Sequence, residues 1–147
     1  MAFNPVWANE VHIGTSATTA TPPVWTYAKL CAGIESMTFN SGEQNQQYFF
    51  LCGNGYAHNE TTGSAASIQI TGRRVVGDTA QDYIAGKQFA LGTDRNTSVK
   101  IIAEGKQIVC DATIGDVVSF GGSALDVNNF SCTIYFNGQP TVTTPQT

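Results

Sequence analysis

The side chains that could do chemistry are few in this chain, and their spacing matches no catalytic or metal site. The two histidines, His12 and His58, are far apart, and neither has the spacing of a metal ligand. Asp78 and Asp82 are four residues apart, where two carboxylates could share one helix face, but acidic groups at a helix start also offset the helix dipole. We favour this second role, and we expect no catalytic residue, no metal ion and no cofactor.

Four cysteines are spread along the chain, without the close pairs of a zinc site or the density of a disulfide scaffold. They are Cys31, Cys52, Cys110 and Cys132. Because a free cysteine packs as a small hydrophobic residue, we expect these to be free, buried thiols.

Aromatic side chains could form a platform on which sugar rings stack, as in carbohydrate-binding modules built on β-sandwiches. The candidates are Trp7, Trp25, Tyr27, Tyr48 and Tyr56. Aromatic residues more often anchor a core or a protein interface, so a carbohydrate-binding module is the less favoured alternative.

The composition suits a protein whose surface is covered at subunit interfaces. Only 12% of the 147 residues are charged, about half the roughly one quarter typical of soluble domains, and Ser, Thr, Asn and Gln replace the missing charges. The net charge of −4 argues against a nucleic-acid clamp, because only Arg73-Arg74 approaches a basic cluster. The start has no signal-peptide pattern and no window is apolar enough for a membrane span, so we expect synthesis in a cytoplasm and no membrane anchor.

Two-residue alternation of apolar and polar side chains dominates the sequence, which predicts antiparallel strands with one buried face. The clearest examples are Ser67–Thr71, Ser98–Ile101, Ile108–Ile114 and Phe130–Phe136. Glu104-Gly105 predicts a tight hairpin turn between two of these strands. Further strands are expected near residues 10–14, 25–31, 35–40, 47–53 and 117–120.

One segment has helical spacing instead. From Asp78 the apolar residues Ala80, Tyr83, Ile84 and Leu91 fall on one stripe, which predicts a short α-helix over about residues 79–90. Asp78 or Thr79 can cap its start, with Gln81 or Asp82 as the capping-box partner three residues later. The fold class is therefore mainly β, an antiparallel β-sandwich or partly closed barrel with this one flanking helix over an open end.

The length fits one domain over residues 1–147, with an N-terminal arm (1–10), a long loop (40–48) and a C-terminal tail (140–147) outside its core. The polar stretch Ser41–Gln47 runs directly into Tyr48-Phe49-Phe50-Leu51. Either this apolar run is covered on both faces within the subunit, or part of it is an exposed edge that awaits a neighbour, and we favour the edge.

The order of several short motifs resembles the tail tube (major tail) proteins of long-tailed bacteriophages, especially the siphophage type. The motifs are Ile68-Gln-Ile-Thr-Gly-Arg-Arg74, then Gly77-Asp-Thr-Ala-Gln81 at the helix start, then Gly121-Gly122, and last Phe136-Asn-Gly-Gln-Pro140. The resemblance covers about residues 39–140. It implies a β-sandwich with one flanking helix, which agrees with the fold expected from periodicity.

The resemblance further implies a structural protein of the virion, assembled in the bacterial cytoplasm, that forms hexameric rings. These rings stack into the tube through which double-stranded DNA passes without specific binding, and the family implies tail terminator, tape measure and tail-tip proteins as partners. It also implies that the loop and the arms contact neighbouring subunits. The interface candidates are Phe3, Trp7, Ser41, Glu43, Gln44, Asn45, Gln46, Gln47, Tyr48, Phe49 and Phe50. A phage head decoration or head-tail joining protein is the main alternative.

Overall fold

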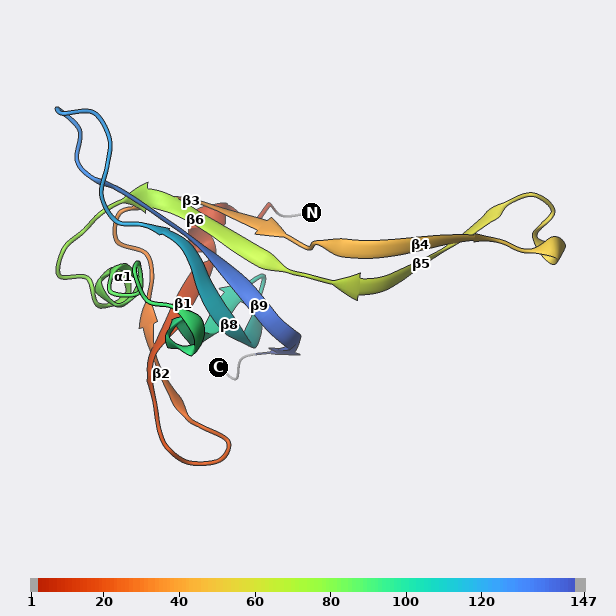
Figure 1. The fold of residues 1–147 in the computed structure, drawn as a ribbon, viewed down its shortest axis with the longest axis horizontal. Coiled ribbons are helices and arrows are strands. Elements are labelled where there is room, and N and C mark those ends of the chain that lie inside the picture. Colours follow the sequence, from red (N-terminus) through yellow and green to blue (C-terminus); the bar gives the residue numbers. More distant parts are fainter. Residues whose placement is uncertain (1–2, 145–147) are drawn as a thin grey trace.

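Antiparallel strands make up most of the computed structural model, which describes residues 3–144 (Figure 1). Seven strands form one sheet in the order β2-β1-β7-β8-β9-β6-β3, and β4 and β5 pair with each other in a second sheet. The fold is therefore mainly β with one short α-helix, as predicted, and the sheet does not close into a barrel within the described residues. The strands are β1 (Glu10–Ala17), β2 (Trp25–Lys29), β3 (Ile34–Asn40), β4 (Glu43–Phe49), β5 (Ala57–Ser64), β6 (Ser67–Arg73), β7 (Asn96–Ala103), β8 (Lys106–Val118) and β9 (Asn129–Thr143), and the helices are η1 (Val6–Ala8), η2 (Leu51–Gly53), α1 (Thr79–Ala85) and η3 (Gly92–Arg95).

One face of the seven-stranded sheet carries the core. The cross-strand partners Ile68 and Ile134 are almost fully buried, and each such side chain contributes about 1.5–3 kcal/mol of hydrophobic stabilisation. Side chains of β3, at one edge, and β7, near the other, line the same hollow, so the sheet coils around this face. The alternation in the sequence therefore correctly predicts which side chains point inward.

The turn between β7 and β8 is the predicted hairpin. Glu104 and Gly105 have φ values of 54° and 73°, and Ala103 pairs with Lys106. Positive φ at both central residues is the geometry of a type I′ turn, whose twist matches that of the two strands it joins.

The helix is shorter than predicted. α1 ends at Ala85 with Gly86 as its C-cap, and the next residues form tighter turns in which Lys87 N–H donates to Ile84 O and Gln88 N–H to Ala85 O. Leu91 was expected on the buried stripe, but its side chain is 84% exposed. The buried contact of α1 with the sheet is made within its two turns, chiefly by Ala80 and Ile84.

Asp78 lies before the first residue of α1, and its Oδ2 accepts a hydrogen bond from Gln81 N–H at 3.1 Å. The predicted capping-box role for the Gln81 side chain is wrong. This side chain is fully buried and turns away from the helix start. Its amide N–H groups donate instead to Ala32 O and Arg73 O.

Two segments expected outside the core differ from prediction. The predicted loop 40–48 is mostly strand β4, which pairs with β5 in a long hairpin. The predicted tail 140–147 begins inside β9, because residues 141–143 pair with the start of β8. Residues 1–2 of the expected N-terminal arm and 145–147 of the expected tail lie outside the described residues.

The cysteines divide into two classes. All four are free, but Cys110 and Cys132 are buried, whereas Cys31 and Cys52 are exposed, so the prediction of buried thiols is wrong for the second pair. Burial raises the pKa of Cys132 to about 12, which keeps that thiol protonated.

Candidate assembly interface

The β4–β5 hairpin projects from the body of the molecule as an arm (Figure 1), defined here as residues 43–64. Its strands pair from Glu43 with Ser64 to Phe49 with Ala57, a reach of about 23 Å at about 3.3 Å per residue. Every residue of β4 is exposed. A lone two-stranded hairpin is marginally stable in water, so an arm of this length is a structure that gains from a covering partner.

Polar side chains hold the arm together near its base. Thr61 Oγ1 donates to Asn45 Oδ1 at 2.7 Å, and Ser64 Oγ donates to Ser41 O at 2.7 Å. The polar residues Gln44–Gln47 therefore act as a spacer without a core of their own. The arm contains two glutamates, one histidine that lies 3.3 Å from Glu60, and no lysine or arginine, so it presents no permanent cation to a neighbour.

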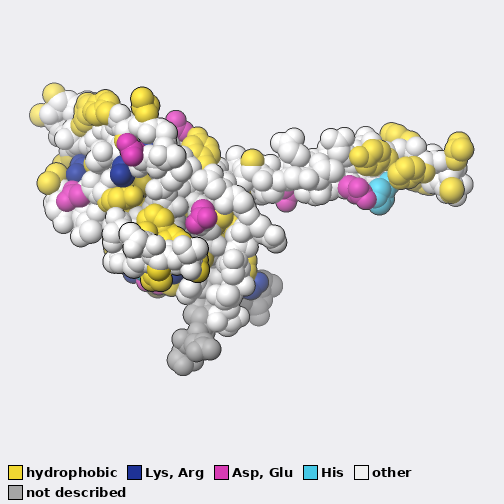
Figure 2. All heavy atoms as spheres, turned by 60° about the horizontal axis from the view of Figure 1, so that its bottom comes forward, with side chains coloured by type: hydrophobic (Ala, Val, Ile, Leu, Met, Phe, Trp, Pro, Cys, Tyr) yellow, Lys and Arg dark blue, Asp and Glu magenta, His cyan; other side chains and the backbone are white. Residues whose placement is uncertain are grey.

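The tip of the arm, defined as residues 48–56, gathers large apolar side chains, as the yellow groups at the end of the arm in Figure 2 show. Phe49, Phe50, Leu51 and Tyr56 are between 57% and 104% exposed, and the rings of Tyr48 and Phe50 stack with centroids 5.9 Å apart. Of the two alternatives left open by the sequence, the exposed edge is the one observed. Apolar groups gathered in this way are typical of protein interaction sites, so the tip is a candidate for one.

The outward face of β3, β6, β9 and β8 has a different chemistry. Cross-strand pairing places Thr38, Gln69 and Thr133 in one row, and Ser36, Thr71 and Ser131 in the next. We call this surface the polar face. Its hydroxyl and amide groups offer hydrogen bonds over a broad area without a strong charge.

Charge on the polar face is paired or negative. Arg73 Nε donates to Glu35 Oε1 at 3.0 Å and its Nη1 to Asn129 Oδ1 at 2.6 Å, so this cation is occupied. Tyr135 OH donates to Asp116 Oδ2 at 2.7 Å, and this hydrogen bond raises the pKa of Tyr135. A surface of this kind lacks the free cations that hold a phosphate backbone.

A row of basic side chains lies elsewhere, on the outward face of β2, β1 and β7. His12 pairs across the strands with Lys29 on one side and Lys100 on the other. Lys29 Nζ lies 2.7 Å from Glu10 Oε1, and Lys100 Nζ lies 4.8 Å from the ring centroid of Tyr27. His12 Nε2 is buried and has no hydrogen-bond partner among the described residues.

Lowering the pH from about 7.5 to about 5 is expected to destabilise the fold through His12. Burial, and then the charge of Lys100, lower the pKa of His12 from its usual 6.5. The folded state therefore binds fewer protons than the unfolded chain, so the stability is fully present above about pH 6.5 and falls with pH below it. Thermal unfolding of the parent and His12→Gln at both pH values tests this. The variant should lose less stability on acidification than the parent. An equal loss in both proteins would show that His12 is not the cause of the acid destabilisation.

The interface candidates from the sequence fall into two groups. Ser41 and residues 43–50 lie together on the arm and at its base, whereas Phe3 and Trp7 lie on the N-terminal segment and are 89% and 85% exposed. Leu51 and Tyr56 also belong to the tip, although neither is among the interface candidates from the sequence. The continuation of the apolar run to Leu51, and the turn-forming Gly53-Asn-Gly55 before Tyr56, were the available signals.

Within the described residues, no three or more His, Cys, Asp or Glu side chains are grouped where they could hold a metal ion. In the same part of the chain, the helices are too short and too polar for any of them to cross a membrane.

Comparison with known proteins finds similarity in structure and not in sequence. No protein-family model and no curated protein matches the chain. A chain in the tail of an empty gene transfer agent particle, with C6 symmetry, aligns at a TM-score of 0.65 with 13% identity over 97% of this chain and 99% of that chain. A chain of the native gene transfer agent virion aligns at 0.68 with 14% identity over 96% and 99%.

Two injection systems give similar results. The tube-terminating cap of the anti-feeding prophage aligns at a TM-score of 0.59 with 14% identity over 99% of this chain and 93% of that chain. A chain from the sheath-tube complex of an extracellular contractile injection system aligns at 0.55 with 12% identity over 96% and 91%. The chain therefore has the fold of these tail and tube components, which confirms the resemblance to phage tail tube proteins at the level of fold.

Proposed function

We propose that this chain is the structural subunit of a phage-type tail tube, in which hexameric rings stack into a conduit for the genome. The observation that carries the proposal is a fold shared over nearly the whole chain with a gene transfer agent tail of C6 symmetry. On this proposal the protein belongs to the virion tail after assembly in the host cytoplasm, and a tail terminator, a tape measure protein and tail-tip proteins are its partners. It performs no catalysis.

The surfaces support this role. The arm offers a neighbouring copy an apolar tip on a long polar spacer, and heterologous contacts of this type are what build rings and stacks from one kind of subunit. The polar face, turned to the lumen, lets DNA slide because it carries no free cation to hold phosphate. The comparisons include both a gene transfer agent and a contractile injection system, and the siphophage type stays a prediction.

Negative-stain electron microscopy of the purified protein over a range of concentrations and salt tests the proposal. We expect annular rings with six-fold averages that stack into hollow tubes. Monodisperse monomers under all conditions would overturn the assignment.

A tube-terminating or head-tail joining ring is the second candidate. The similarity to the anti-feeding prophage cap over 99% of this chain favours it. The same micrographs separate the two, because a terminating ring of fixed number does not stack. The carbohydrate-binding alternative gains no support, since Trp25 in β2 and Tyr56 at the arm tip lie on separate elements and form no shared platform.

Replacing Gln69 by Lys is expected to make assembled tubes retain DNA. Gln69 is exposed on the polar face, so six copies would place six added cations around each ring of the lumen. DNA retention at low salt should rise about tenfold or more and fall steeply as salt is added. Thr93→Lys, which adds the same charge in the η3 turn outside the polar face, is the matched control. Equal retention by the two variants would contradict the placement of the polar face at the lumen.

A further inference from the structure

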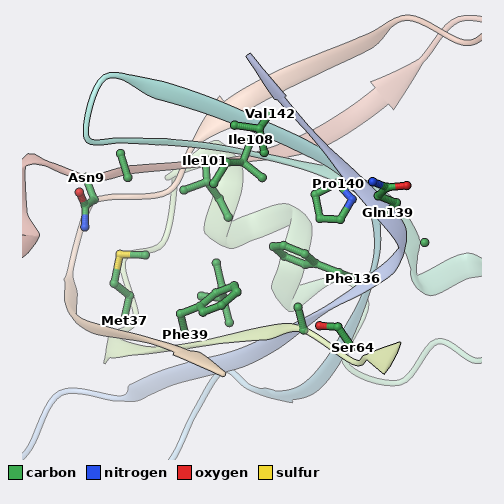
Figure 3. A pocket seen from close by; sticks show the side chains of 14 residues that line it. Asn9, Met37, Phe39, Ser64, Ile101, Ile108, Phe136, Gln139, Pro140 and Val142 are labelled. Atoms are coloured by element: carbon green, nitrogen blue, oxygen red, sulfur yellow. The ribbon is translucent and has the colours of Figure 1, made fainter. Parts of the chain in front are cut away.

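An apolar hollow of about 650 Å³ opens between the two halves of the coiled sheet, at the end where the arm begins (Figure 3). Its walls come from β3, β6, β7, β8 and β9, and the rim includes Ser64 at the base of the arm and Gln139. The lining residues within the described chain include no charged side chain. Met37, Phe39, Ile108, Phe136 and Val142 are the principal apolar groups, and Figure 3 shows them around one space.

The hollow is an open part of the core, where apolar side chains are only partly covered. Phe39 and Val142 are 58% and 56% exposed, although Phe39 pairs across the strands with the buried Ile68 and Val142 with the half-buried Ile108. Removing apolar surface from water is favourable by about 25 cal/mol for each Å², so a group that covers these side chains would bind favourably. The arm of the same chain does not supply one, because its tip lies about 23 Å beyond Ser64 at the rim.

We infer that the hollow receives the arm tip of a second copy of this chain. The tip is a convex cluster of Phe49, Phe50 and Leu51, and the hollow is a concave surface of the same chemistry. A volume of about 650 Å³ lies within the about 300–1,000 Å³ of pockets that bury organic ligands, so several tip side chains fit. An apolar anchor seated in a well-shaped pocket is the usual centre of a strong interface.

The charge of the two surfaces and their places in the subunit also suit the arm tip of a second copy as the occupant of the hollow. Neither the hollow nor residues 48–56 of the tip include a charged side chain, so docking buries no unpaired ion. Each copy has one arm and one hollow in different places, so one contact leaves a further arm and a further hollow free for the next copy. The inference rests on the proposed function and deepens it, because it names the surface that receives the arm.

Another apolar surface competes for the tip. Val76, Phe120 and Leu125, on the loops before α1 and between β8 and β9, are between 60% and 101% exposed at the end of the molecule opposite the arm (Figure 1). These side chains stand on loops, whereas the hollow has walls on several sides. The geometry therefore favours the hollow.

Cross-linking from the native Cys52 at the arm tip tests the inference directly. In a Cys31→Ser background Cys52 is the exposed thiol, since Cys110 and Cys132 are buried. A second thiol is added by Gln139→Cys at the rim of the hollow or, as the matched control, by Leu125→Cys at the opposite end, and both parent residues are exposed. Each protein is concentrated, treated with a short bismaleimide and analysed by denaturing electrophoresis and peptide mass spectrometry.

We expect intermolecular cross-links from Cys52 to the thiol introduced by Gln139→Cys at about tenfold or greater yield than to the thiol introduced by Leu125→Cys. A seated tip has a high local concentration at the rim, which favours the first product. Adding Phe50→Ser should remove this product.

A cross-link from Cys52 to the control position in place of the rim position would overturn the inference, and so would the absence of both products. Electron microscopy of the same samples separates this outcome from the proposed function. If tubes form without a cross-link at the rim, the proposed tube function stands, and the docking of the arm tip in the hollow is refuted.

Discussion

Removal of the arm is expected to abolish tube formation and leave a folded monomer. Ala65 N–H donates to Gly42 O at 3.0 Å, which is the spacing that a two-residue hairpin turn bridges, so Asn-Gly can replace residues 43–64. The removed strands bury none of the core side chains. Changes to exposed residues away from structural features usually alter stability by no more than about 0.5 kcal/mol, so the melting temperature should change little.

Sedimentation velocity and negative-stain microscopy measure the assembly of this deletion, and circular dichroism measures its fold. Asn59→Ala is the matched control, because it changes an exposed side chain of β5 that is not an interface candidate and keeps the length and tip of the arm. The control should assemble as the parent does. Tubes of normal length from the deletion would show that the arm is dispensable, and unfolding of the deletion would show that the arm stabilises the body.

Replacement of Gln81 by Leu is expected to destabilise the monomer by about 3–6 kcal/mol, because it leaves the part-buried backbone groups that bond to the Gln81 amide without partners, at about 1–3 kcal/mol each. The Gln81 amide donates to Ala32 O at 2.6 Å and to Arg73 O at 3.0 Å, and Oε1 accepts from Val75 N–H at 2.7 Å. This single side chain therefore joins α1 to the segment before β3 and to the end of β6. Leucine has a similar size but cannot make any of these bonds.

Chemical denaturation of the parent and Gln81→Leu measures the effect. Since domains are commonly stable by about 5–15 kcal/mol, the variant should be close to unfolding at moderate temperature. Gln69→Leu removes the same amide from an exposed position and should change stability by no more than about 0.5 kcal/mol. A loss below about 1 kcal/mol for Gln81→Leu would show that water or other groups satisfy its partners.

Gln81 and the arm contribute to assembly in different ways. The Gln81 side chain holds the body of one subunit together, whereas the arm acts between subunits. A variant that fails at Gln81 should lose assembly because the subunit unfolds, and the arm deletion should lose assembly with the subunit intact. Measuring the fold and the assembly on the same samples distinguishes the two.

Local patterns in the sequence determined the core strands and their inward faces, but they missed β5 and predicted a strand near 47–53, where β4 ends at Phe49 and η2 begins at Leu51. Alternation placed Ile68, Ile70 and Ile134 in the core, and each of these is almost fully buried. The hairpin at Glu104-Gly105 could also be predicted, because residues that tolerate positive φ mark such a turn. The Asp78 cap belongs to the same class, since donor and acceptor are three residues apart.

Only the tertiary structure decided the features that join distant segments. The polar stretch Glu43–Gln47 has no alternation because neither of its faces is buried, so its pairing with β5 left no mark that a periodicity could show. The sequence predicted a capping-box role for Gln81 at the helix start. The fold instead brings Ala32, 49 residues away, next to the Gln81 amide, which donates a hydrogen bond to Ala32 O. The hollow arises because the coiled sheet brings β3 and β8 to face each other, and that curvature is a property of all seven strands together.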